Sequence, residues 1–203
     1  MLKELLEAHL FFHSFTKIKD KILVVDEVTK SGNFSLVDPK ACAGCKYVCN
    51  EEPSEREQLK ITSTKPVNIV NIEQVFSYIK EDVGEICDYM LEGVDSTMLV
   101  EMSCSTTVHV KCKRPKARGQ LYNTLEKLFT CPPVRTHIEK HALRYVIFSW
   151  KETFPDDAEM DDAEKSMIGM TMLADAVYSP DNESKFDFGF KMKEIRFPHA
   201  LVI

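Results

Sequence analysis

Two carboxylates in apolar surroundings are the side chains of this chain with the clearest chemical potential. Asp88 lies in the apolar stretch 86–91, and Glu101 lies in the apolar stretch 98–104. A charge inside an apolar strand is costly unless it is paired or binds a metal ion. Mg²⁺ and Mn²⁺ prefer oxygen ligands, and Mg²⁺ needs only one or two carboxylates because it keeps several waters. The pattern predicts a divalent-metal site made by Asp88, Glu101 and the backbone carbonyl of Met102. Two simpler interpretations compete: Glu101 faces solvent, or it pairs with Arg118.

A run of basic residues follows Glu101 and suits an anionic partner. Residues 102–125 contain no Asp or Glu, but they contain five cations: Lys111, Lys113, Arg114, Lys116 and Arg118. Pro115 suits the first turn of a helix, and the N-terminus of a helix favours phosphate. Cations oppose the helix dipole at that end, which favours an anion nearby. The run predicts phosphate contacts with DNA or RNA through Lys113, Arg114, Lys116 and Arg118. The alternative is a solvated helix start.

The elements that must hold these side chains are strands and helices in mixed order. Strands are predicted from apolar or alternating runs at 86–91, 97–104, 106–112 and 143–150. Helices are predicted from apolar spacing at 71–81, with Asn71 as its N-cap, and at 115–129. This order predicts an α/β (α+β) fold with a central mixed sheet flanked by helices.

The two ends of the chain are predicted to add to this core. Residues 1–65 are expected to form a helix at 1–17, a β-hairpin from strands at 21–29 and 34–37, and a short strand at 59–64 that Pro66 ends. Residues 66–150 form the core. Residues 151–203 begin with a segment, 152–164, that has seven acids and no base, and continue with a helix at 165–177 and a strand at 186–197. One compact domain is the expected result.

Composition excludes several classes of protein. The chain has 203 residues and a net charge of −6, so it does not coat nucleic acid through its global charge. It has no apolar run near the roughly 18–20 residues that span a bilayer. Glu4 and Glu7 replace the basic start of a secretory signal. We therefore expect a cytoplasmic protein with no membrane partner. The seven cysteines are odd in number and do not suggest a disulfide framework.

Two weaker patterns concern other metals. Cys42, Cys45 and Cys49 begin with the Cys-x2-Cys spacing of zinc sites, but no fourth ligand follows nearby. A loop with free thiols is the alternative. His137 and His141 are four residues apart and would share one face of a helix, but two histidines alone do not indicate a metal site.

The stretch from Asn71 to Trp150 resembles the PD-(D/E)XK nuclease superfamily, which has the restriction-endonuclease-like fold. Asp88 matches the Asp that ends one strand in that family, and Glu101-Met102-Ser103 falls where Glu-x-Lys belongs on the next strand. Gln120 matches a Gln that the following helix often carries, and Glu73 matches an acid that some members place in the preceding helix. The resemblance implies hydrolysis of DNA or RNA with Mg²⁺ or Mn²⁺, in which Gln120 orients a water or the metal shell.

Ser103 is the departure from this family pattern, because the resemblance implies a Lys there that helps to activate the attacking water. Lys111, Lys113 or Lys116 is expected to replace it. The alternative is a catalytically degenerate nuclease fold that acts as a nucleic-acid-binding or protein-assembly subunit, with a protein partner or a second copy of the chain.

Overall fold

One mixed β-sheet organises the chain. The computed structural model describes residues 2–10, 25–37, 48–50, 57–78, 83–105, 107–152, 163, 166 and 182–203. Within these ranges nine strands are joined in the order β2-β1-β3-β4-β5-β6-β8-β7, and β9 pairs with β3. Their bounds are β1 Glu27–Val37, β2 Val48–Asn50, β3 Glu57–Asn71, β4 Tyr89–Glu92, β5 Ser96–Ser105, β6 Leu143–Glu152, β7 Glu183–Lys185, β8 Lys191–Arg196 and β9 Ala200–Val202.

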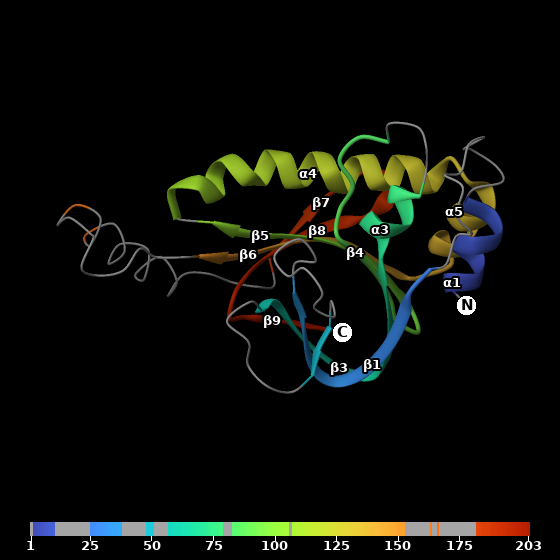
Figure 1. Ribbon diagram of the computed structural model, residues 1–203, viewed down its shortest axis with the longest axis horizontal. Coiled ribbons are helices and arrows are strands. Elements are labelled where there is room, and N and C mark those ends of the chain that lie inside the picture. Colours follow the sequence, from blue (N-terminus) through green and yellow to red (C-terminus); the bar gives the residue numbers. More distant parts are fainter. Residues whose placement is uncertain are drawn as a thin grey trace.

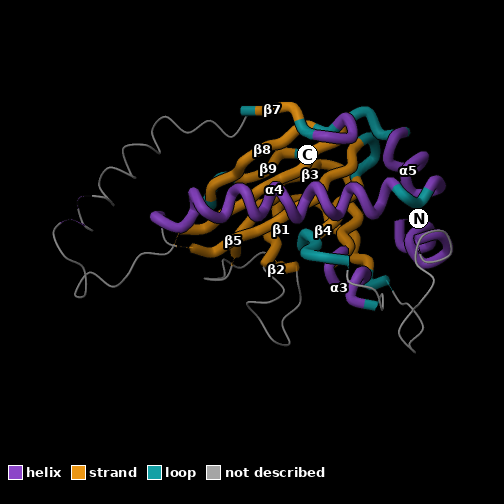
Figure 2. Tube along the Cα trace, turned by 90° about the horizontal axis from the view of Figure 1, so that it is seen from above, coloured by secondary structure: helices purple, strands orange, loops and turns teal. Residues whose placement is uncertain are grey.

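Helices lie on one face and at one end of this sheet. The described helices are α1 Leu2–Leu5, the π-helical turn Leu6–Leu10, α3 Ile72–Ser77, α4 Thr107–Phe129, α5 Pro132–Glu139 and a 3-10 turn, Asp187–Gly189. Helix α4 runs along the sheet, and β1 and β3 curve away on the other side (Figure 1). Figure 2 shows α4 crossing over the strands, with α5 beside its C-terminal end. The prediction of an α+β fold with a central mixed sheet is confirmed.

The strand directions explain why α4 is a helix from its start. β3, β4 and β5 pair antiparallel, whereas β5, β6 and β8 pair parallel. A parallel pair needs a crossover of a dozen or more residues, usually a helix, and α4 with α5 supplies it between β5 and β6. The predicted strand at 106–112 is wrong, because β5 already has neighbours on both edges and the chain enters α4 at Thr107. The predicted helix start at Pro115 is wrong for the same reason, since Pro115 and the cations around it lie inside α4 and not in its first turn.

The core has two layers, one on each face of the sheet. Met90 and Leu99 pack with Leu121 and Leu125 of α4 in one buried cluster. Side chains of the alternate positions, such as Tyr89, lie in the second cluster on the opposite face. Because successive side chains of a strand alternate between faces, position in β4 and β5 decides which residues lie under α4.

The N-terminal strands differ from the sequence prediction. The expected hairpin at 21–37 is replaced by one strand, β1, which passes through Gly32 and pairs with β3. Gly32 has φ +80, a conformation that glycine adopts readily, and it lies beside a register shift. Pro66 does not end β3, because it lies opposite that shift, where the ladder needs no N–H donor.

Other predictions have mixed outcomes. Asn71 caps α3 as predicted, since its Oδ1 accepts the backbone N–H of Gln74 at 2.9 Å. The strand predicted at 186–197 begins with the 3-10 turn, and only Lys191–Arg196 is strand. The expected boundary at 65/66 falls within β3, and strands from all three expected parts join one sheet.

Several expected features lie outside the described part of the chain. They are most of the helix predicted at 165–177, most of the acidic segment 152–164, and Cys42 and Cys45. Cys49 belongs to β2, where only the backbone is described. None of the helices within the described ranges is both long and apolar enough to cross a membrane.

Candidate functional site

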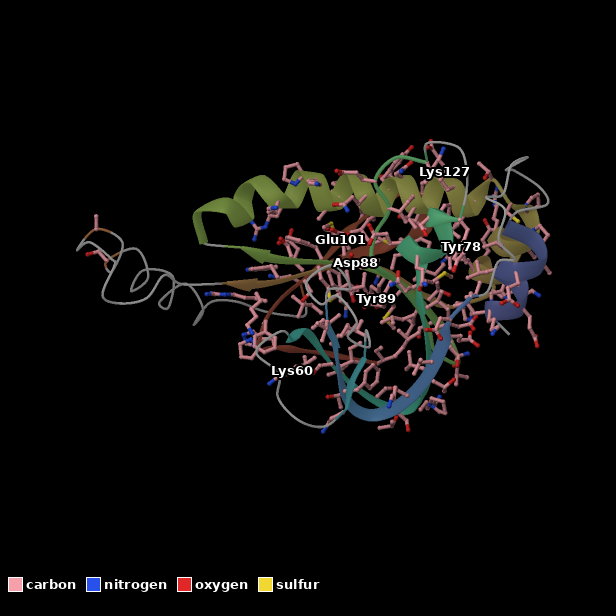
Figure 3. The ribbon with its side chains drawn as sticks, in the orientation of Figure 1. Lys60, Tyr78, Asp88, Tyr89, Glu101 and Lys127 are labelled. Atoms are coloured by element: carbon pink, nitrogen blue, oxygen red, sulfur yellow. The ribbon has the colours of Figure 1, made fainter. Side chains whose placement is uncertain are left out.

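Asp88 and Glu101 come from adjacent segments of one antiparallel pair of strands. In the pair β4–β5, Tyr89 is opposite Val100 and Met90 is opposite Leu99. Asp88 comes directly before β4, and its N–H donates to the carbonyl of Val100 at 3.0 Å, which places it beside the Val100–Met102 segment of β5. Glu101 alternates with Leu99, which packs under α4, so Glu101 points to the α4 face. Figure 3 places the labelled Asp88 and Glu101 next to each other below α4.

Both carboxylates are buried and their backbone is held in place. Asp88 is 4% exposed and Glu101 is 8% exposed, so Glu101 does not face solvent. The Asp88 Oδ2 accepts the backbone N–H of Met102 at 2.7 Å, which fixes the orientation of this carboxyl group. The Asp88 carbonyl accepts the N–H of Ile72 at 3.0 Å, and the N–H of Glu73 lies 3.5 Å away. The start of α3 therefore fastens the segment that carries Asp88.

Two polar residues of α4 cover the segment that leads to Asp88. The Gln120 Nε2 donates to the carbonyl of Ile86 at 3.4 Å, and the backbone N–H of Cys87 donates to the Thr124 Oγ1 at 3.0 Å. Gln120 is 7% exposed and Thr124 is fully buried. Helix α4 thus contacts the segment Ile86–Cys87, and the start of α3 contacts Asp88, which follows it. Asp88, Glu101, Gln120 and the backbone of Glu73, far apart in sequence, meet around the start of β4.

The pKa of the Cys87 thiol is raised by its burial and by the charges of this site. Burial raises the pKa of Cys87 well above its ordinary value of 9.0, and the negative charges of Glu101 and Asp88 raise it further. The hydrogen bond with Thr124 opposes this rise. The thiol is therefore protonated at neutral pH, and it is a poor nucleophile because the thiolate is the reactive form.

Three of the predicted phosphate-binding residues pair with carboxylates of this chain. Arg114 contacts Glu194 at 2.9 Å and lies over the Trp150 ring, and Lys116 contacts Glu85 at 2.9 Å. The Arg118 guanidinium lies 4.0 Å from Asp187, over the Phe186 ring and 3.6 Å from the Met192 sulfur. These ion pairs are half exposed, so each contributes little to stability and can exchange for a phosphate partner.

Two of the predicted lysines, Lys113 and Lys116, share a helix face with Gln120, and Lys116 is paired with Glu85. Residues 113, 117 and 120 follow the i, i+4, i+7 spacing of one face, and Ala117 and Gln120 are buried while Lys113 is exposed. A strand rises about 3.3 Å per residue and a helix about 1.5 Å, so the residues of α4 level with Ser103 are roughly 111–113. By this rise, Lys113 is the described lysine of α4 that comes nearest in level to Ser103. The side chain of Lys111 lies outside the described residues.

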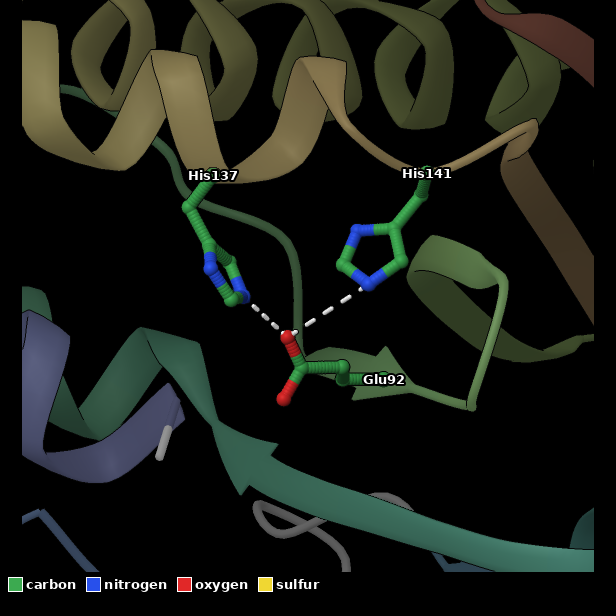
Figure 4. A group of neighbouring side chains, drawn as sticks. All are labelled: Glu92, His137 and His141. Atoms are coloured by element: carbon green, nitrogen blue, oxygen red, sulfur yellow. Dashed lines mark hydrogen bonds and ion pairs between the residues drawn. The ribbon is translucent and has the colours of Figure 1, made fainter.

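A second polar cluster lies at the other end of β4. Glu92, His137 and His141 place one ligand atom each within 4.8 Å of one another, an arrangement that could hold a metal ion. The Glu92 Oε1 contacts the His137 Nε2 and lies 3.8 Å from the His141 Nε2 (Figure 4). Glu92 is 7% exposed and comes from the end of β4, whereas His137 is in α5 and His141 follows it.

The environment of His141 keeps its imidazole neutral. Burial lowers the pKa of His141 from its ordinary value, and the neighbouring His137 lowers it further. Glu92 and Asp95 oppose this shift. The His141 Nδ1 is 2.7 Å from the Thr97 Oγ1, so the hydrogen bond orients the ring and its Nε2 faces Glu92. Metal-ligating histidines are neutral and usually have such an outer partner.

Sequence reasoning did not identify this cluster. It noted the spacing of the two histidines, but Glu92 is 45 residues from His137. Helix α5 ends at Glu139, so His141 reaches the cluster from the segment beyond the helix and not from a shared helical face. Spacing alone contains no signal for a third ligand contributed by a separate strand.

Comparison with protein-family models, with curated proteins and with solved structures gives no match for this chain.

Proposed function

We propose that this protein is a metal-dependent phosphodiesterase that acts on DNA or RNA at Asp88 and Glu101. The observation that carries the proposal is that two buried carboxylates come from adjacent segments of one strand pair, with Gln120 of α4 bonded to the segment before Asp88. Two like charges in such a place repel each other, and a bound cation relieves that repulsion. The proposal also agrees with the family resemblance, in which an Asp at a strand end and a Glu on the next strand hold the metal.

The donor atoms of this site fit Mg²⁺ or Mn²⁺. Both side chains offer carboxylate oxygens, and the Met102 backbone lies within hydrogen-bond distance of Asp88. When bound, such an ion makes a water nucleophilic and stabilises charge on the leaving oxygen. Asp88 and Glu101 would hold the ion, and the Met102 N–H keeps the Asp88 carboxyl oriented. The Met102 carbonyl as a third ligand stays a prediction.

The basic half of the site is assigned to α4. Lys113 is exposed and lies on the Gln120 face, and the rise of helix and strand puts it roughly level with Ser103, so it is our candidate to orient the attacking water or neutralise the phosphate. Arg114, Lys116 and Arg118 lie on the same helix and would contact the flanking phosphates. Gln120 keeps its role as an orienting group, since it is buried against the Asp88 segment.

Cleavage assays test this proposal. Labelled single- and double-stranded DNA and RNA are incubated with Mg²⁺ or Mn²⁺ and with wild type, Asp88→Asn or Glu101→Gln. We expect each substitution to lower the rate at least about 100-fold, because loss of even an outer partner of a metal ligand costs about 10–100-fold. Glu126→Gln, on the exposed side of α4, is the matched control. Cleavage that persists unchanged in both site variants would exclude this assignment.

The alternative function is a degenerate nuclease fold that binds nucleic acid or a protein partner without cutting. Two observations favour it: Ser103 replaces the family Lys, and Arg114, Lys116 and Arg118 are already paired with acids. A binding subunit would retain DNA or RNA with a salt-dependent affinity and show no cleavage with either metal. Lys113→Ala separates the two functions, because it should abolish cleavage in an enzyme but weaken a pure binder only slightly.

A further inference from the structure

We propose that Glu92, His137 and His141 form a second metal site, selective for Zn²⁺, that is separate from the proposed phosphodiesterase site. Two imidazole nitrogens and one carboxylate oxygen lie within 4.8 Å of one another. Imidazole suits Zn²⁺ and similar late transition metals, whereas Mg²⁺ and Ca²⁺ prefer oxygen ligands only. The two metal sites therefore differ in donor chemistry as well as in place.

The positions of the ligand atoms need little change to hold Zn²⁺. Zn²⁺ binds imidazole nitrogen at about 2.0–2.1 Å, so tetrahedral ligand atoms lie about 3.3 Å apart. The His141 Nε2 is 3.8 Å from the Glu92 Oε1. The His137 Nε2 is in direct contact with the same oxygen and would move outward as the ion enters (Figure 4). A small rotation of the His137 ring supplies that movement.

The ligands of this cluster are largely buried, and an outer hydrogen bond orients one of them, as in protein metal sites. The Thr97 hydroxyl, on a fully buried residue, holds the His141 Nδ1 at 2.7 Å and leaves Nε2 for the ion. The side chains of Glu92 and His141 are 8% and 11% exposed, whereas that of His137 is 28% exposed. The ion would therefore have three protein ligands and one position open towards solvent for a water, as in hydrolytic zinc sites.

The site would also fasten α5 to the sheet. Glu92 ends β4, Thr97 lies in β5, and both histidines come from α5 or the turn after it. A shared ion would thus connect three elements at the end of the sheet where α1 and α5 meet (Figure 1). Binding to the folded chain alone raises stability by mass action, so Zn²⁺ should raise the melting temperature.

Equilibrium dialysis of the untagged full chain against ZnCl₂, and Co²⁺ absorption as a probe of ligand type, test this site. We expect one Zn²⁺ bound at this site and a Tm that rises with Zn²⁺ but not with Mg²⁺ at the same concentration. Co²⁺ bound at this site should give the absorption spectrum of a tetrahedral complex, without thiolate-to-metal charge-transfer bands. His141→Gln and Glu92→Gln should each weaken binding at least about 100-fold, and Thr97→Val about 10–100-fold. His199→Gln is the matched control, since His199 lies near the C-terminal strand β9.

The cysteine cluster Cys42, Cys45 and Cys49 is the competing zinc site, so a triple Cys→Ser variant is measured in parallel. Binding that survives the triple variant and is lost in His141→Gln supports the proposal. Binding that is lost in the triple variant and survives both His141→Gln and Glu92→Gln overturns it, as does the absence of any Zn²⁺ binding by folded wild type. Circular dichroism confirms folding, and Thr97→Val, which removes no ligand, replaces any ligand variant that fails to fold.

Discussion

Neutralising Glu101 should stabilise the metal-free protein. Asp88 and Glu101 are both buried and come from adjacent segments at the start of β4 and in β5. Neighbouring positions on paired strands are about 5–8 Å apart, and two unit charges at that separation repel by roughly 2–3 kcal/mol at an effective dielectric constant of about 20. Glu101→Gln keeps the shape of the side chain and removes one charge, so we expect a gain of about 1–3 kcal/mol in the free energy of unfolding. In a chain of this size, that gain raises Tm by about 2–12 °C.

The assay is urea and thermal unfolding at pH 7 in EDTA and again with excess Mg²⁺. Wild type should gain about 1.4 kcal/mol or more when Mg²⁺ exceeds its dissociation constant tenfold, whereas Glu101→Gln should gain much less. Glu126→Gln removes an exposed charge of α4 and should change neither value by more than about 0.5 kcal/mol. A Glu101→Gln protein that is less stable than wild type in EDTA would show that the charge serves a structural ion pair, and it would refute the repulsion on which this argument rests.

Two further predictions concern the residues that hold the Asp88 segment. Thr124→Val removes the acceptor of the buried Cys87 N–H and should cost about 1–3 kcal/mol in urea denaturation, whereas Thr124→Ser keeps the hydroxyl and should cost less; equal losses would contradict the role of this hydrogen bond. The raised pKa of Cys87 favours the folded state below pH 9.0, the ordinary thiol value, and this contribution is lost as the pH rises above it, because the unfolded chain then loses the proton first. The free energy of unfolding should therefore fall more steeply between pH 9 and 10.5 in wild type than in Cys87→Ala, and parallel slopes would exclude the shift.

The sequence predicts the central part of this fold well because local and tertiary preferences agree there. Asn71 caps a helix through a contact three residues away, and the apolar run at 143–150 forms a strand whose residues 146–150 are buried in the sheet. The stretch 106–112 was misjudged because Val108, Val110 and Cys112 alternate as in a strand. Its conformation is set instead by the parallel pairing of β5 with β6, which only a crossover can connect.

The two candidate sites were accessible to sequence reasoning to different extents. Asp88 and Glu101 are 13 positions apart on consecutive strands, so the register of one hairpin brings them together and an ordered motif reveals them. The cluster of Glu92 with His137 and His141 depends on how α5 packs against the end of β4, which no local pattern encodes.

Both proposed sites lie on the helical face of β4, one at each end of a four-residue strand. Asp88 and Glu92 are four residues apart, which separates them by about 13 Å. That distance exceeds the range of about 7–10 Å over which substitutions usually couple. The two sites should therefore act independently: Asp88→Asn should leave Zn²⁺ binding within about twofold of wild type, and His141→Gln should leave any Mg²⁺-dependent cleavage within about threefold. If His141→Gln abolishes both Zn²⁺ binding and cleavage, the two sites are coupled. In that case the Zn²⁺ ion would order β4, the strand that both sites share.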